Sequence, residues 1–184
     1  MGSIPGAITT RLDNSAVALQ WQDGHLSVEN HVSGSTHVFD FPAFSVVLSG
    51  HSITPDECDF AGFSGDDKSV TFAYAHAASG TAIEVCYALE DDKPWFRKRL
   101  KLAAPAGTPT PDRVYVDVQS NPPSPIRRVG YGLRGGRDAE EQTGLETYAE
   151  KPACGYPVYA GDWFFGLEHA SGFAVPGDAL SLYH

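Results

Sequence analysis

The fold class follows from one stretch of sequence, Val70-Thr-Phe-Ala-Tyr-Ala-His-Ala-Ala-Ser-Gly-Thr-Ala-Ile-Glu-Val-Cys-Tyr-Ala-Leu89. Large side chains occupy alternate positions in both halves of this stretch: Val70, Phe72, Tyr74 and His76, then Ile83, Val85, Tyr87 and Leu89. Successive side chains of a β-strand point to opposite faces, so each half predicts a strand with one buried face. The four residues 77–80 supply a turn, and the whole stretch predicts an antiparallel hairpin.

The same period-two pattern continues on both sides of this hairpin. Val17, Leu19 and Trp21 alternate, Asp23-Gly24 forms a tight turn, and Leu26, Val28, Asn30 and Val32 alternate again. Further strands are predicted at 36–41, 44–49, 59–63, 95–102, 113–119, 157–169 and 179–184. The Gly-rich, charged stretch 127–151 predicts a long surface loop. Because no long window supports an amphipathic helix, the pattern predicts an all-β sandwich or barrel with mostly antiparallel pairing.

Composition and charge narrow the function. The chain has 184 residues with 23 acidic and 13 basic side chains, a net charge of -10, which is the wrong sign for neutralising nucleic-acid phosphates. Its longest apolar runs, such as 44–48, are far shorter than the roughly 18 residues that a membrane span needs. We therefore expect no nucleic acid and no membrane as partner. The start, Met1-Gly-Ser-Ile-Pro5, lacks the pattern of a secretory signal, which slightly favours a cytoplasmic location.

Cofactor and metal motifs are weak. Cys58, Cys86 and Cys154 are widely spaced and predict reduced thiols, with Cys86 buried on a strand. Gly130-Tyr-Gly-Leu-Arg-Gly135 matches G-x-G-x-x-G, but no helix-forming segment follows to present its N-terminus to a pyrophosphate. The seven histidines form no metal-binding pair, and the acidic residues lack calcium-loop spacing. We expect no cofactor and no metal.

Aromatic residues beside charged ones form two candidate sites for carbohydrate. Sugar sites present flat aromatic faces to a pyranose ring and use charged or polar groups for its hydroxyls. In the first, Trp95 shares a strand face with Arg97, Arg99 and Lys101, opposite Phe96, Leu100 and Leu102; the alternative is an exposed cation–π ladder. In the second, Asp162, Phe164 and Glu168 share one face, and Trp163, Phe165, Leu167 and His169 share the other; the alternative is that Trp163, Phe165 and Leu167 belong to the core.

Asp162 and Glu168 do not form a hydrolytic pair. Glycoside hydrolysis needs two carboxyl groups about 5 to 9 Å apart across a cleft. Six residues of extended strand separate these two by roughly 20 Å. The sequence therefore marks no catalytic residue.

Three segments together resemble the N-terminal β-sandwich domain of α-galactosidase-like multidomain glycoside hydrolases. They are 21–30, 87–102, and 155–169 with 180–184. The resemblance implies a galactose-mutarotase-like supersandwich whose catalytic residues lie in a (β/α)8 barrel of the same parent protein. It carries over Asp162, Trp163, Glu168 and His169 as positions on the rim of the substrate pocket. Because the chain ends inside a predicted strand at His184, we expect residues 1–184 to be one sandwich domain, a fragment of a longer glycoside hydrolase.

Three functions follow from this sequence. The first is a non-catalytic sandwich domain of a carbohydrate-active enzyme, packing on the barrel and completing its substrate pocket. The second is a free-standing carbohydrate-binding module with aromatic platforms. The third is an aldose epimerase-like enzyme, which needs a histidine acid and a carboxylate base that converge on a concave sheet face.

Overall fold

The computed structural model describes residues 8–22, 24–120, 126–129, 145–147, 153–154, 158–160, 162–168, 173–175 and 180–183. These residues form antiparallel strands and one short 3-10 turn, which confirms the predicted all-β sandwich. The chain divides into two compact units, Met1–Val116 and Asp117–His184, which we describe separately. Whether residues 1–184 are one domain of a longer enzyme stays a prediction.

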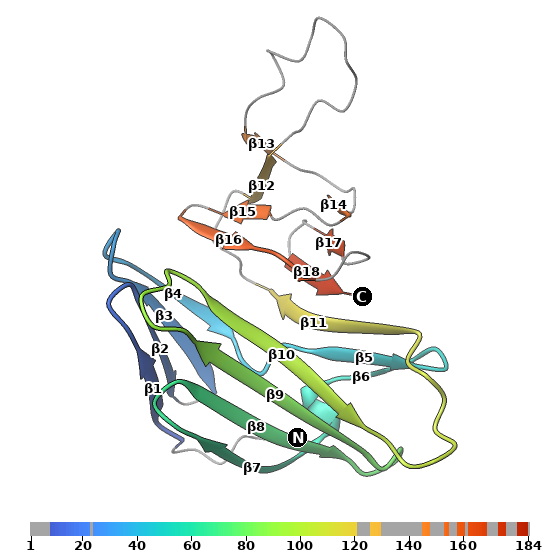
Figure 1. Cartoon of the computed structure of the whole chain (residues 1–184). Helices are drawn as coiled ribbons and strands as arrows, with labels where there is room; N and C mark the ends of the chain where they lie inside the picture. The colour runs from blue at the N-terminus through green and yellow to red at the C-terminus, as the bar shows by residue number, and fades with distance from the viewer. Residues whose placement is uncertain are drawn as a thin grey trace, which may run out of the picture. The chain divides into compact units, whose positions relative to one another are not determined.

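The first unit contains two four-stranded sheets and a smaller group of strands (Figure 1). One sheet has the order β1-β2-β3-β4, and the other has the order β10-β9-β8-β7. The smaller group pairs in the order β11-β5-β6, and the 3-10 turn η1 (Pro55–Glu57) follows β6. The strands are β1 (Thr10–Asp13), β2 (Val17–Gln22), β3 (His25–Asn30), β4 (Ser35–Asp40), β5 (Ser45–Leu48), β6 (His51–Ile53), β7 (Asp59–Gly65), β8 (Ser69–His76), β9 (Thr81–Leu89), β10 (Phe96–Ala103) and β11 (Arg113–Gln119).

The hairpin predicted first, from residues 70–89, is β8 and β9. Phe72 pairs with Val85 and Tyr74 pairs with Ile83, so the large side chains of both strands share one face. That face is buried along the whole length of the hairpin, including His76 at the end of β8. The period-two pattern thus predicted the strands and also which of their faces enters the core.

Aromatic rings join the two four-stranded sheets. The ring of Trp21 on β2 lies 5.6 Å from that of Phe72 on β8 and 5.1 Å from that of Tyr87 on β9, centroid to centroid. Phe41, which follows β4, contacts Phe72 at 4.7 Å. Burying a large apolar side chain fully stabilises a fold by about 1.5–3 kcal/mol, and Trp21, Phe72 and Tyr87 are all buried, so this aromatic cluster links the two sheets.

Two details of the first unit differ from the prediction. Strand β3 ends at Asn30, and Val32 lies in a turn with 79% of its surface exposed, because the Asn30 side-chain oxygen accepts hydrogen bonds from the Val32 and Ser33 backbone amides. Cys86 lies on β9 but is half-buried, since it points away from the core face; Cys58 is the buried thiol. Burial, reinforced by two neighbouring carboxylates, raises the pKa of Cys58 to about 11 and keeps the thiol protonated.

Strand β10 also has a polar residue on its inner face. Lys98 pairs directly with Tyr87 in the sheet, on the side of Leu100 and Leu102. Its ammonium group donates a hydrogen bond to the backbone oxygen of Ala43 at 2.5 Å and lies 5.8 Å from the Tyr87 ring. The apolar part of the Lys98 side chain lies along the inner face, and the Ala43 carbonyl oxygen accepts a hydrogen bond from its ammonium group, which explains how a lysine occupies this face.

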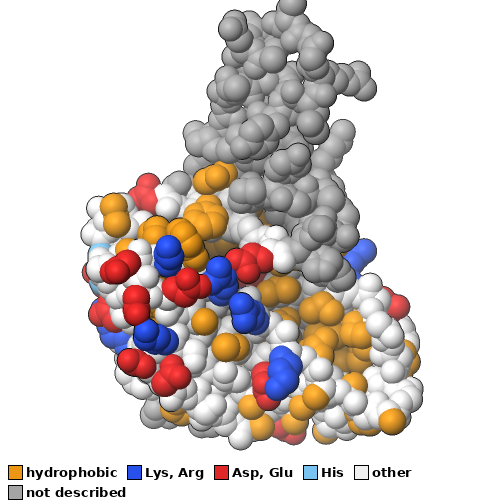
Figure 2. All heavy atoms as spheres, in the orientation of Figure 1, with side chains coloured by type: hydrophobic (Ala, Val, Ile, Leu, Met, Phe, Trp, Pro, Cys, Tyr) orange, Lys and Arg blue, Asp and Glu red, His pale blue; other side chains and the backbone are white. Residues whose placement is uncertain are grey.

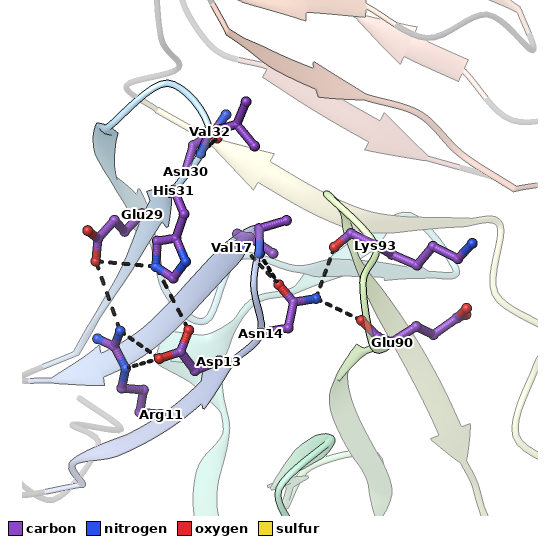
Figure 3. Close-up of polar contacts among 11 residues, drawn as sticks. Arg11, Asp13, Asn14, Val17, Glu29, Asn30, His31, Val32, Glu90 and Lys93 are labelled. Atoms are coloured by element: carbon purple, nitrogen blue, oxygen red, sulfur yellow. Dashed lines mark hydrogen bonds and ion pairs between the residues drawn. The ribbon is translucent and has the colours of Figure 1, made fainter.

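Asn14 links two turns that are far apart in the sequence (Figure 3). Its side-chain oxygen accepts hydrogen bonds from the backbone amides of Ala16 and Val17, both at 2.8 Å. Its side-chain amide donates to the backbone oxygens of Glu90 and Lys93, at 2.7 and 3.0 Å. One side chain therefore holds the β1–β2 connection against the β9–β10 connection.

Among its described residues, the second unit has seven short strands in two sheets, with orders β13-β12-β15-β16 and β14-β17-β18 within the unit. Two of them, β12 and β13, pair within the stretch predicted as a surface loop, so that prediction is wrong in part. Buried Val158, Ala160, Leu180 and Leu182 form a small core. The strands are β12 (Ile126–Val129), β13 (Leu145–Thr147), β14 (Ala153–Cys154), β15 (Val158–Ala160), β16 (Trp163–Phe165), β17 (Phe173–Val175) and β18 (Leu180–Tyr183).

The link made by Asn14 predicts a specific loss of stability. Replacing Asn14 with Ala removes four hydrogen bonds, two of them to a distant turn, and we expect the free energy of unfolding to fall by about 2 kcal/mol. Asn30→Ala is the matched control, because Asn30 makes only the two local bonds described above and its loss should cost about half as much. Urea unfolding of both variants measures the difference. Equal losses would show that the link between the two turns contributes nothing.

Candidate functional site

The hairpin of β15 and β16 presents a face of aromatic and acidic side chains. Tyr159 and Phe164 pair directly across its two strands, so their side chains are neighbours on the same face. Phe164 is 51% exposed, although phenylalanine side chains are usually buried in folded proteins. Two exposed carboxylates flank β16 in the sequence: Asp162 in the turn before it and Glu168 three residues after it. We call Tyr159, Asp162, Phe164 and Glu168 the hairpin face.

The opposite side of this hairpin belongs to the core of the second unit. Trp163, Phe165 and Leu167 are half-buried and alternate with the exposed residues. Phe165 and Leu167 pack against the cluster around Val158 and Leu180. Trp163 is therefore on the other side of β16 from Phe164, and His169 lies outside the described residues. Of the residues that the sequence singled out here, Asp162 and Glu168 are exposed on either side of β16, and the structure adds the pairing of Phe164 with Tyr159.

Trp95, the other candidate, lies just before β10 and is 36% exposed. The ammonium group of Lys93 lies 5.5 Å from the centre of its ring. Beyond it, Arg97 forms an ion pair with Glu90, and Lys101 forms one with Glu84 at 3.0 Å. The cation over the Trp95 ring is therefore Lys93 from the preceding turn, while Arg97 and Lys101 are engaged by carboxylates.

A group of side chains that the sequence did not predict meets at the end of β8. The imidazole of His51 stacks on that of His76 at 6.4 Å, and its Nε2 lies 3.2 Å from the Glu57 carboxylate. His76 Nδ1 lies 2.8 Å from the hydroxyl of Ser79. These residues come from β6, η1 and β8, and their spacing in the sequence has no motif, so only the tertiary structure reveals them.

Glu57 has two roles in this group. It accepts a hydrogen bond from the backbone amide of Thr54 at 3.0 Å, which closes the 3-10 turn η1. This backbone bond lowers the pKa of Glu57 most, and the nearby His51 and His76 lower it further. The carboxylate thus fixes a turn, and it is already engaged by protein groups.

Acidic and histidine side chains also meet on β1 and β3, at one edge of the view in Figure 3. The Arg11 guanidinium donates to Asp13 at 3.0 Å, and His31 Nε2 lies 3.8 Å from both Asp13 and Glu29. All four side chains are substantially exposed, which is typical of a solvated outer face. Across the described residues, no group of three or more His, Cys, Asp or Glu side chains is arranged to hold a metal ion.

A shallow hollow of about 270 Å³ lies between β5, β10 and the proline-rich segment 104–111. Its lining is mainly apolar, with Val46, Leu48, Leu102 and three prolines, and its polar groups are threonines. It has no charged side chain to orient a polar ligand, and we place no site there.

The comparisons with known proteins do not assign the chain. No protein-family model matches it, and no curated protein or solved structure matches it either. Among the described residues, no helix has the length and apolar character to cross a membrane. The function must therefore be argued from the faces described above.

The lowered pKa of Glu57 predicts a pH dependence of stability. Because the folded-state value is below the ordinary value of 4.5, the ionised form favours folding; this contribution is present above that pH and is lost as the pH falls through the folded-state value. Glu57→Gln should be less stable than the parent chain at pH 7, and the difference should shrink as the solution is acidified. Urea midpoints across the acid range measure it.

Asp56→Asn is the control for this experiment. It removes a carboxylate from the same turn, and that carboxylate is exposed and makes no described hydrogen bond or ion pair. Its difference from the parent should change little with pH. A Glu57→Gln variant whose deficit is the same at every pH would contradict the assignment.

Proposed function

We propose that this chain is a carbohydrate-binding β-sandwich domain that works as the non-catalytic N-terminal part of a glycoside hydrolase. The observation that carries the proposal is the hairpin face, where the exposed ring of Phe164 lies beside Tyr159 and is flanked by Asp162 and Glu168. Exposed aromatic rings with carboxylates at their borders are the elements from which sugar sites are built.

The chemistry of a sugar fits this face. A pyranose has an apolar side of C–H groups and an equatorial rim of hydroxyls. Directly paired residues of an antiparallel hairpin have Cβ atoms about 4.5–5.5 Å apart, so Tyr159 and Phe164 form one continuous apolar strip for the C–H side. Asp162 and Glu168 are then acceptors for hydroxyl groups at the ends of that strip.

The proposed role is binding, with the bond cleavage performed elsewhere. Asp162 precedes β16 and Glu168 lies three residues past its end, so the strand separates the two carboxylates, and the sequence marks neither as part of a hydrolytic pair. The resemblance of three segments to the sandwich of α-galactosidase-like enzymes supports a (β/α)8 barrel of the same parent protein as the catalytic partner. Asp162, Glu168 and the unplaced His169 would then border its substrate pocket.

The two alternative functions are distinguished by different observations. A free-standing carbohydrate-binding module would use the same hairpin face and would bind polysaccharide as strongly alone as in any longer protein. An aldose epimerase needs an acid and a base held apart by the sugar ring. His51 and Glu57 contact each other directly at 3.2 Å, which leaves no room for a ring between them.

The test of the proposal is sugar binding by the purified chain. Isothermal titration calorimetry with galactose-, glucose- and mannose-based oligosaccharides should find at least one ligand. Phe164→Ala should weaken its binding by about tenfold, because one stacked ring contributes roughly 1 kcal/mol or more. Phe63→Ala is the matched control, since Phe63 is 49% exposed on β7 in the first unit and has no role in the hairpin face.

Two results would overturn this assignment. Binding that survives in Phe164→Ala but is lost in Phe63→Ala would move the sugar site to the first unit. Polarimetry that finds catalysed mutarotation of galactose by the purified chain would replace a binding role with the epimerase.

A further inference from the structure

We propose that the outer face of β10 is a second binding site, which recognises a polysaccharide that carries carboxylate groups. Arg97, Arg99 and Lys101 of β10 form it, together with Lys93 and Trp95, which directly precede the strand; these five residues are called the β10 stripe below. It lies in the first compact unit, whereas the hairpin face belongs to the second, and the inference does not depend on the proposed function.

The backbone of β10 aligns the cationic side chains. Arg97, Arg99 and Lys101 pair with Ala88, Cys86 and Glu84 of β9, so they point to the side opposite Leu100 and Leu102. Alternate residues of a strand are about 6.5–7 Å apart, which spaces the charges regularly along one line. Figure 2 shows Lys and Arg side chains following the course of β10 across the visible face.

The concentration of positive charge here is unusual for this chain. The stretch 93–101 contains five of the chain's 13 basic residues and no acidic residue, although the whole chain has a net charge of -10. Lys98 points inward to the Ala43 carbonyl, which leaves the other four for the stripe. A polyanion repelled by most of the molecular surface would find its attractive contacts on this strand.

The existing ion pairs of the stripe are of a kind that a ligand can replace. Arg97 pairs with Glu90 and Lys101 pairs with Glu84, and the side chains of Lys101 and Glu84 are 74% and 43% exposed. Exposed ion pairs contribute only about 0–1 kcal/mol, so a ligand carboxylate can take the place of the protein carboxylate at little cost. Arg99 is exposed and has no hydrogen bond or ion pair with any described residue, and it is the first contact for an anion.

The exposed indole of Trp95 indicates which kind of anion the stripe binds, namely a sugar acid. The indole ring is partly exposed just before β10, with the Lys93 ammonium over one face, so an apolar sugar face would stack on the other face while its carboxylate meets the cations. Nucleic acid has one charge for every 1.7 Å or so of duplex, a density that the acidic remainder of this chain opposes. A polysaccharide with one carboxylate on each sugar is less densely charged and fits the spaced cations better.

The binding experiment uses polygalacturonate, neutral galactan and a single-stranded DNA oligonucleotide with the full chain. We expect polygalacturonate to bind at low ionic strength and to be released by salt, while neutral galactan does not bind to the stripe. Arg99→Gln should weaken this binding about two- to fivefold and should lower the dependence of the logarithm of affinity on salt by about one charge.

A second variant distinguishes a specific binding site from a general effect of lost charge or lost folding. Glu84→Gln frees Lys101 from its partner and should strengthen polygalacturonate binding about two- to fivefold. Arg11→Gln is the control, because it removes an exposed arginine from the other sheet, also paired with an acid, and should leave binding unchanged. Phe164→Ala should also leave polygalacturonate binding unchanged. The proposal for the hairpin face and the proposal for the stripe can therefore fail independently.

Three outcomes would overturn the inference. The first is equal binding of polygalacturonate by the parent chain and Arg99→Gln with matched urea midpoints. The second is no gain, or a loss, in Glu84→Gln. The third is tighter binding of the oligonucleotide than of polygalacturonate, which would identify the stripe as a nucleic-acid contact.

Discussion

The contact of Trp21 with Phe72 and Tyr87 is the interaction on which the first unit depends, because it joins the two four-stranded sheets. These rings fill the interior, but the indole nitrogen of Trp21 and the hydroxyl of Tyr74 have no hydrogen-bond partner among the described residues. Each unpaired polar atom costs about 1–3 kcal/mol, which the burial of the large rings offsets. Burial also raises the pKa of Tyr74, so its hydroxyl stays protonated. The free energy gained by burying the large aromatic rings therefore outweighs the cost of leaving their polar atoms without a hydrogen bond.

This packing determines where the candidate sites lie. Each strand gives one face to the core, so the other face is open to charged and aromatic residues without loss of packing. On β10 the inner positions hold Leu100 and Leu102 and the outer ones hold Arg99 and Lys101. The hairpin of β15 and β16 follows the same rule around its own small core. Both candidate sites are outer faces of strands whose inner faces are fixed by apolar contacts.

The sequence predicted the features that depend on local periodicity, above all the hairpin 70–89 and its buried face. It did not predict short strands such as β1 and β6, and it placed one strand at 157–169 where the structure has the antiparallel hairpin of β15 and β16. The periodic pattern was wrong where a side-chain hydrogen bond ends a strand. The Asn30 side chain accepts a bond from the Val32 backbone amide, and β3 ends at Asn30. The sequence also could not reveal groups from distant segments, such as His51 with His76, or Asn14 with the turn at Glu90. Those contacts depend on how sheets pack, and no spacing in the sequence encodes them. For the candidate sites, periodicity predicted that Phe164 faces away from Trp163 and Phe165, but it did not predict that Tyr159 pairs with Phe164.

In the two proposals, the sign of the charge separates the ligands of the two faces. Asp162 and Glu168 flank β16, so a sugar carboxylate at the hairpin face would meet like charges, and the proposed ligand there is a neutral sugar with many hydroxyl donors. The β10 stripe has the opposite sign, and a neutral sugar gains nothing from Arg99 that water does not already supply. Salt acts differently on the two, because screening weakens an ion contact more than the stacking of a ring on an apolar sugar face. A polymer that contains both neutral and acidic sugars can therefore offer each face its own part, without competition between the faces for one residue of the ligand.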